Sequence, residues 1–287
     1  MSSLTMPNGH AVCLERPVIM GILNVTPDSF SDGGNWGDPG EAVRHALDMA
    51  DQGAQIIDVG GESTRPGSQP VAAEEQMRRV LPVIERIARS RSDLAISIDT
   101  SIASVAAAAL EAGASILNDV SAGRSDPGMF ELAAATAAPL ILMHMQGTPR
   151  TMQQEPAYVD VVAQVKQFLC RRVDAAIVAG VRSDQIIVDP GIGFGKASWH
   201  NLALLANLHR IVADGLPVLL GTSRKRFMGE LCRVADNTTP RPAELVEATC
   251  ATTALGVAAG VAVFRVHDVK ANRQAADVAW AILQARS

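Results

Sequence analysis

Polar and charged side chains recur at the carboxyl ends of short apolar runs along the whole sequence. They are Asn24, Asp58, Asp99, Asn118 with Asp119, His144, Asp189, Ser223 with Lys225, and Arg265 with His267. Any one of them could be an ordinary turn or helix-cap residue, since Asp and Asn favour both positions. As a set they exceed what caps require, and burying such groups without partners costs about 1–3 kcal/mol each. We therefore expect them to converge on a ligand.

Four of these residues suit a flat, neutral heterocycle. Asp99, Asn118 and Asp189 offer hydrogen-bond acceptors and one amide, while Lys225 offers a donor. A heterocycle with N–H groups on one edge and a carbonyl on the other would satisfy this mixture.

Three cationic or titratable residues form a second group. Arg65, Arg265 and His267 suit an anion such as phosphate, which they would hold through charge-assisted hydrogen bonds. The site is therefore predicted to have one pocket for a ring and another for an anion.

The first polar segment also contains oxygen ligands for a divalent cation. Asn24, with Asp28 or Asp32 from the loop that follows it, could bind Mg²⁺. This ion usually takes few protein groups and completes its shell with phosphate oxygens and water. Which of the two aspartates would contact the metal stays open.

The elements that must position these residues alternate regularly. Apolar, β-branched runs predict strands at 18–25, 56–60, 95–99, 115–120, 139–144, 186–189, 217–221 and 261–266. Stretches rich in Ala, Leu, Glu, Arg and Gln predict helices at 41–52, 73–88, 102–112, 129–137, 158–179, 199–213, 244–259 and 273–284. Eight such alternations predict a parallel sheet covered by helices.

We predict an α/β fold with a single (β/α)8 TIM barrel over residues 18–287, preceded by an N-terminal extension at 1–17. A doubly wound sheet is the alternative, but eight evenly spaced strands favour closure. The loops after the first two strands, 26–40 and 61–70, are long and rich in Gly, Pro, Ser and Asp, which is typical of mobile lids. The active sites of such barrels lie at the carboxyl ends of the strands, where the polar set falls.

A weak internal repeat supports this organisation. Residues 51–58 (DQGAQIID) and 111–118 (EAGASILN) share a helix end, a glycine and the start of a strand, with looser copies at 178–180 and 259–263. Glycine just past a helix is a common stop, because it adopts a positive φ without a Cβ clash.

Composition excludes several classes of protein. The 287 residues are 48% hydrophobic and 19% charged, which supports a large core and excludes disorder. The net charge of −5 comes without a run of Lys or Arg, and aromatic residues make up only 3%. Nucleic-acid binding needs clustered basic charge and stacking rings, so we expect none.

The cellular compartment is predicted from the distribution of cysteines and from the lack of a recognisable signal peptide or membrane-spanning stretch. Cys13, Cys170, Cys232 and Cys250 are scattered, with none of the density of a disulfide scaffold. The N-terminal region has no apolar segment typical of a signal peptide, and the most apolar stretch, 254–264, is too short to span a bilayer. We expect a cytoplasmic protein with no membrane association.

Two local patterns suggest a phosphate-binding loop and a zinc site, but the sequence supports neither. The glycine-rich segment 191–196 (GIGFGK) resembles a phosphate loop, but its glycine spacing is short and Ala197 stands where Ser or Thr is needed. His144 could be a zinc ligand, yet no second His or Cys lies at ligand spacing. A packed or hydrogen-bonded histidine is therefore favoured.

The segments that carry these residues resemble, in order, the motifs of the dihydropteroate synthase family. They are 20–34 (MGILNVTPDSFSDGG), 57–67 (IDVGGESTRPG), 97–100 (SIDT), 118–119 (ND), 143–145 (MHM), 189–196 (DPGIGFGK), 223–225 (SRK) and 265–269 (RVHDV). The resemblance extends over residues 18 to 287, and no substrate position of the family is altered.

The resemblance implies a transferase that condenses (7,8-dihydropterin-6-yl)methyl diphosphate with 4-aminobenzoate. Its products would be 7,8-dihydropteroate and diphosphate, in folate biosynthesis, with Mg²⁺ as cofactor. By correspondence, the residues for the pterin diphosphate would be Thr64, Asp99, Asn118, Met143, Asp189, Phe194, Lys225, Arg265 and His267. Those for 4-aminobenzoate would be Phe30, Thr64, Pro66, Ser223 and Lys225, with Arg65, Lys225, Arg265 and His267 catalytic and Asn24 on the metal.

Two alternatives differ from this interpretation in their sequence marks. A methyltetrahydrofolate-dependent methyltransferase would share the acidic heterocycle site but lack the Ser-Thr-Arg-Pro segment and the Arg-Val-His segment, and both are present. A non-catalytic pterin-binding paralogue would have lost Thr64, Arg65, Asp99 or Lys225, and none is lost. The family resemblance also implies a homodimer formed through the later helices, and the small, apolar residues at 248–259 are compatible with it.

Overall fold

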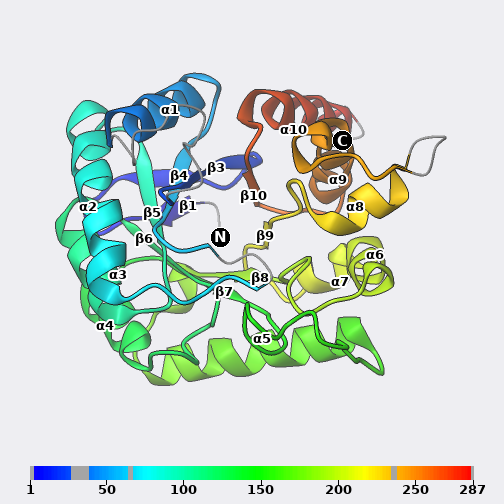
Figure 1. Cartoon of the computed structure of the whole chain (residues 1–287), viewed down its shortest axis with the longest axis horizontal. Helices are drawn as coiled ribbons and strands as arrows, with labels where there is room; N and C mark the ends of the chain where they lie inside the picture. The colour runs from blue at the N-terminus through cyan, green and yellow to red at the C-terminus, as the bar shows by residue number, and fades with distance from the viewer. Residues whose placement is uncertain (1–2, 27–38, 64–66, 234–237, 286–287) are drawn as a thin grey trace.

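Eight parallel strands form one sheet in the computed structural model, which describes residues 3–26, 39–63, 67–233 and 238–285 (Figure 1). The strands are β3 (Val18–Asn24), β4 (Ile56–Gly60), β5 (Ala95–Asp99), β6 (Ile116–Asp119), β7 (Leu140–Met143), β8 (Ile186–Asp189), β9 (Leu219–Leu220) and β10 (Val263–Val266). They pair in chain order, and β10 lies between β3 and β9. A bridge between Val188 and Val218 joins the last two edges. The predicted (β/α)8 barrel is therefore confirmed, and the doubly wound alternative is excluded because the sheet closes.

Helices surround the strands (Figure 1). They are α1 (Pro39–Asp51), α2 (Ala73–Ser90), α3 (Ala103–Glu111), α4 (Gly128–Thr136), α5 (Val161–Val178), α6 (Ser198–Ala206), α7 (Leu208–Val212), α8 (Arg226–Leu231), α9 (Val246–Ala258) and α10 (Val269–Gln284), with 3-10 turns η2 (Ser183–Gln185) and η3 (Pro242–Glu244). The main core lies between helices and sheet, where strand residues such as Ile57 cluster with helix residues such as Val83 and Ile84. No helix in the described part of the chain has the length and hydropathy to cross a membrane.

The helix predicted at 199–213 is wrong in its continuity, because it breaks into α6 and α7 at Asn207. The Asn207 Nδ2 donates to the carbonyl of Ala203 at 2.9 Å, and the residue has φ −116° and ψ 21°. Asn side chains compete with the backbone for local hydrogen bonds, which explains the break. Helix α8, which follows β9, was not predicted.

A β-hairpin precedes the barrel strands and was also not predicted. Its strands, β1 (Ser3–Thr5) and β2 (Ala11–Cys13), are antiparallel, with Leu4 paired to Val12. The buried hairpin side chains cluster with interior residues from every barrel strand: Val18 and Met20 of β3, and Ile56, Ala95, Ile116, Ile141, Ile187, Leu219 and Val263. The hairpin thus closes the amino end of the barrel. The missed signal was Asn8-Gly9, a dipeptide typical of hairpin turns, with Gly9 at φ +82°.

The glycines of the internal repeat end helices as predicted. Gly53 follows α1 with φ +104°, and Gly113 follows α3 with φ +115°. A Cβ at Gly113 would lie 2.7 Å from the Ala88 Cβ on α2. Each glycine therefore lets the chain turn directly from a helix into the next strand.

Truncating the hairpin core should destabilise the barrel. Leu4→Ala removes a fully buried side chain from the amino end, so we expect the free energy of unfolding to fall by about 2–5 kcal/mol. Urea unfolding followed by circular dichroism measures this loss. Thr5→Ala is the matched control, because Thr5 lies on the exposed face of the same strand. Equal stability of the two variants would show that the hairpin does not contribute to the core.

Candidate active site

The carboxyl ends of three strands meet at one guanidinium group. Arg265 on β10 donates from Nε to Asp58 Oδ2 at 2.6 Å and from Nη2 to Asp99 Oδ2 at 2.7 Å. Asn118 Nδ2 lies 3.1 Å and 3.3 Å from the two oxygens of Asp58. The side chains of Asp58 and Asp99 are 0% and 6% exposed, and that of Arg265 is 18% exposed. A buried network of charges therefore crosses the barrel.

Strand register brings these residues together. Gly60 pairs with Asp99, and Asp99 pairs with Asn118, so the polar ends of β4, β5 and β6 lie at one level. Alternate residues of a strand face the same side. Asp58 therefore faces the barrel interior one step below Gly60, where Arg265 reaches it.

Burial perturbs the acids of this site. It raises the pKa of Asp99 to about 7, because the nearby charge of Arg265 only partly offsets the lost hydration. Burial likewise lowers the pKa of Arg265, but the attraction of Asp58 and Asp99 outweighs it and raises that pKa above its ordinary value. Arg265 therefore stays charged, and Asp99 binds a proton more readily than an exposed aspartate does.

Asp189 occupies the end of β8 beside the same cations. Burial raises its pKa to about 6, against the opposing effects of a hydrogen bond from the Gly191 amide and the charges of Lys225, Lys196 and Arg265. The Gly191 N–H lies 2.7 Å from Asp189 Oδ1. The charges of Lys225 and Arg265 both lower the pKa of Asp189, so the three side chains lie in one site.

An apolar floor lies next to these acids. Met143 and Phe194 belong to a small buried cluster with Val120, Met145 and Met152. The Lys225 Nζ stands 3.9 Å from the centre of the Phe194 ring, a cation–π contact. A flat ring could lie on such a surface while the acids bind its edge.

The loops after β9 and β10 are tied together. Ser223 Oγ lies 3.1 Å from the backbone nitrogen of His267 and 3.0 Å from its Nδ1. Arg224, at φ +58°, forms a two-point ion pair with Asp268 at 3.0 Å and 2.6 Å. These contacts fix the backbone around Ser223, Lys225 and His267.

Asn24 ends β3 at the same rim. A methyl group on Gly60 would lie 3.8 Å from Asn24 Oδ1 and 3.8 Å from Asp99 Oδ2, so both oxygens approach one point. In the described part of the chain, no group of three His, Cys, Asp or Glu side chains is arranged to hold a metal ion.

Most of the residues that the sequence predicted for the site lie at this rim of the barrel. The structure brings together Asp99, Asn118 and Arg265 in one network and Asp189, Phe194 and Lys225 in another. Phe30, Thr64, Arg65 and Pro66 lie outside the described residues, as do Asp28 and Asp32.

Some contributing residues were given no role from the sequence. Asp58 was noted at a strand end, and only its 2.6 Å contact with Arg265 shows what it does. Arg224 and Asp268 lay inside recognised motifs without a function. His144, favoured as a hydrogen-bonded histidine, is confirmed as one by its contact with Lys196 at 2.9 Å.

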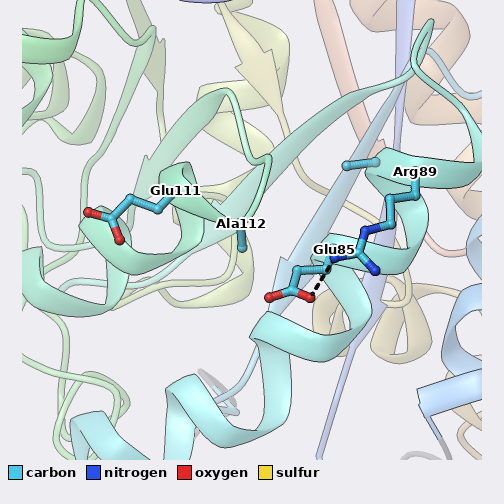
Figure 2. A pocket seen from close by; sticks show the side chains of 5 residues that line it. Glu85, Arg89, Glu111 and Ala112 are labelled. Atoms are coloured by element: carbon cyan, nitrogen blue, oxygen red, sulfur yellow. Dashed lines mark ion pairs between the residues drawn. The ribbon is translucent and has the colours of Figure 1, made fainter.

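A separate surface pocket of about 360 Å³ lies between α2 and α3, lined by Glu85, Ala88, Arg89, Glu111 and Ala112 (Figure 2). Its lining comes from the carboxyl-terminal ends of these helices and the start of the following loop. In a (β/α)8 barrel those helix ends face the amino ends of the strands. The pocket therefore lies at the opposite end of the barrel from the candidate site.

Comparisons with known proteins agree with the geometry. The family model described as "Pterin binding enzyme" matches residues 20–267. Dihydropteroate synthase of Escherichia coli K12 is 44% identical over 278 residues, 97% of this chain and 96% of the relative. That of Mycobacterium leprae is 46% identical over 268 residues, 93% of this chain and 94% of the relative.

Solved structures are similar over nearly the whole chain. The Xanthomonas albilineans dihydropteroate synthase with 4-aminobenzoic acid has a TM-score of 0.90 and 44% identity, covering 99% of this chain and 98% of that one. The same organism's enzyme in complex with 7,8-dihydropteroate has a TM-score of 0.86 and 41% identity, covering 99% of both chains. A Yersinia pestis complex with a sulfonamide drug has a TM-score of 0.91 and 41% identity, covering 98% of this chain and 99% of that one.

The buried carboxyl of Asp189 should make stability depend on pH. Its folded pKa of about 6 exceeds the ordinary 3.8, so above pH 6 a charge stays buried, whereas below pH 6 the folded state takes up a proton. Asp189→Asn removes this charge. We expect the variant to be more stable than the parent by up to about 3 kcal/mol at pH 8, an advantage that shrinks as pH falls to 4.

Urea unfolding of the ligand-free protein across this pH range measures the difference. Asp48→Asn is the control, because the Asp48 side chain is exposed and its replacement removes no buried charge. If Asp189→Asn changes the free energy of unfolding by the same amount at pH 5 and pH 8, the raised pKa of Asp189 in the folded state is contradicted.

Proposed function

Because this chain belongs to the dihydropteroate synthase family of pterin-binding enzymes, we propose that it condenses (7,8-dihydropterin-6-yl)methyl diphosphate with 4-aminobenzoate. The products are 7,8-dihydropteroate and diphosphate, a step of folate biosynthesis. The observation that carries this proposal is the convergence of Asp99, Asn118, Asp189, Lys225 and Arg265 at one rim of the barrel. The family model that matches residues 20–267 confirms the family resemblance. The relatives reported above are dihydropteroate synthases and not methyltransferases.

The pterin ring would bind where buried acids meet the apolar floor. Asp99 and Asp189 have raised pKa values because each lacks enough donors to offset burial. Pterin N–H groups would supply those donors and favour the charged carboxylates. Asn118 and Lys225 would hold the other ring edge, while Met143 and Phe194 support its face.

The diphosphate would lie beside the cationic end of β10. Arg265 and His267 follow one another at that rim, and Thr64 and Arg65, outside the described residues, would complete the anion site. Departure of diphosphate leaves positive charge on the pterin methylene and negative charge on the leaving group. Fixed cations that meet this developing charge typically lower the barrier by about 3–4 kcal/mol per donor.

The second substrate needs positioning more than activation. The amine of 4-aminobenzoate is already unprotonated at neutral pH, so no strong general base is required. Ser223 and Lys225, with Phe30, Thr64 and Pro66, would hold it in line with the methylene carbon. We propose that sulfonamides, as anionic arylamine mimics, occupy the same subsite.

We propose Mg²⁺ as the cofactor, with Asn24 as its ligand from the described chain. The Asn24 Oδ1 approaches the same point as Asp99 Oδ2. A hard amide oxygen at the rim fits an ion that binds few protein groups and several phosphate oxygens. When bound, the ion would neutralise charge on the diphosphate.

Dihydropteroate formation from the two purified substrates tests the proposal. We expect turnover that falls sharply when EDTA removes Mg²⁺ and returns when the ion is added back. Arg265→Ala should lower kcat by at least about a hundredfold, since it removes a charge beside the leaving group. Arg226→Ala is the control, because that arginine is 89% exposed on α8. A wild-type protein that binds pterin without forming product would instead be the non-catalytic paralogue.

We also propose a cytoplasmic homodimer. All four cysteines are unpaired, which suits a reducing compartment. Helices α9 and α10 lie side by side (Figure 1) and expose Leu255, Val278 and Ile282, which are 66%, 61% and 54% exposed. An apolar surface of this kind is typical of a subunit interface.

Breaking this apolar surface should separate the subunits. Leu255→Glu places a charge in the proposed interface, so we expect light scattering after gel filtration to give the mass of one chain rather than two. Val178→Glu on α5 is the matched control, since Val178 is 89% exposed on another helix. A wild-type mass of one chain would refute the dimer.

A further inference from the structure

The ammonium group of Lys196 is buried at the centre of a glycine-rich loop. Its Nζ lies 2.9 Å from His144 Nδ1, 2.8 Å from the Gly191 carbonyl oxygen and 2.9 Å from the Phe194 carbonyl oxygen. The residue is 3% exposed. Burial lowers the pKa of Lys196 to about 7. The three acceptors match the three N–H donors of its protonated form, so it is this form that holds the loop.

His144 can accept this hydrogen bond because its ring is neutral. Burial, together with the charge of Lys196, lowers the pKa of His144 to about 2. Because an ammonium group has no lone pair, the Nδ1 that faces it must be the unprotonated nitrogen of the neutral ring and accepts the hydrogen bond. The ring is held edge-on to Phe168 at a centroid distance of 4.8 Å, so the acceptor is fixed in place.

The loop is wound tightly against the end of β7. Gly191, Gly193 and Gly195 all have positive φ, at +65°, +82° and +61°. A Cβ on Gly191 would lie only 1.9 Å from the His144 carbonyl oxygen. The tight turn directs carbonyl oxygens inward, and the Lys196 ammonium satisfies two of them.

The same loop presents residues of the pterin pocket. Gly191 donates its amide to Asp189, and Phe194 supplies the ring under the Lys225 ammonium. Gly193 lies against the Lys225 side chain, since a Cβ there would lie 2.9 Å from Lys225 Cδ. A shift of the loop would therefore move an acid, an aromatic face and a cation together.

We propose that Lys196, through its hydrogen bond to His144, is a positioning residue that holds the 190–196 loop in the shape that binds the pterin ring. This inference rests on the proposed function, because it assigns the pocket to a pterin. The motif is thus not a phosphate loop, because its lysine is buried and its Nζ contacts acceptors of the protein itself.

Lys196→Met tests the role of the ammonium with a side chain of similar length. We expect the Kd for pteroic acid, measured by calorimetry, to rise at least tenfold. The KM for the pterin diphosphate should rise similarly, with a smaller change in the KM for 4-aminobenzoate. Wild-type affinity for pteroic acid in this variant would overturn the proposal.

Two variants of His144 isolate the hydrogen bond. His144→Asn keeps an acceptor near the Nδ1 position, whereas His144→Leu has a similar size and no acceptor, and both lose the ring contacts equally. We expect the Asn variant to bind pteroic acid at least fivefold more tightly than the Leu variant. Equal affinity of the two would overturn the role of His144, and this comparison holds even if Lys196→Met fails to fold.

Hydrogen–deuterium exchange separates this inference from the proposed function. In the ligand-free protein, amides of residues 190–196 should exchange faster in His144→Leu than in His144→Asn, whatever the substrate is. A wild-type enzyme that forms no dihydropteroate would refute the proposed function alone. A wild-type enzyme that is active, with unchanged exchange and affinity in the variants, would refute the inference alone.

Discussion

One guanidinium group between two buried carboxylates determines much of this site. Arg265 contacts Asp58 and Asp99 at 2.6 Å and 2.7 Å, and both acids are almost fully buried. A buried charge without a partner is strongly destabilising, so the ends of β4, β5 and β10 must stay in register for the barrel to be stable. The same constraint leaves a cation fixed at the rim, where an anionic leaving group could use it.

The site is held at some cost to the ligand-free protein. Asp99 and Asp189 keep raised pKa values because burial removes water that the protein's own donors do not replace. Perturbed acids of this kind cluster where ligands bind. The surrounding barrel supplies the stability that tolerates them, through a main core between sheet and helices and a second core under the N-terminal hairpin.

Local sequence patterns, each spanning only a few neighbouring residues, predicted most of the strands and helices. Runs of apolar residues located all eight barrel strands, and Gly53 and Gly113 end helices as expected. The helix break at Asn207 and the N-terminal hairpin were not predicted, because the local sequence pattern there is weak or is overridden by other contacts. The break at Asn207 depends on a side-chain hydrogen bond, and the hairpin strands are three residues each. Such short strands are stable only when they pack on a core that is distant in the sequence.

The amino-acid sequence alone determined the alternation of strands and helices, and it determined which polar residues stand at strand ends. It also carried the family motifs. Only the tertiary structure decided which of these residues touch, since Arg265 and Asp58 are 207 positions apart and Lys196 and His144 are 52 apart. The pKa values were likewise decided there, because desolvation depends on the surroundings of a group in space and not on its neighbours in the chain.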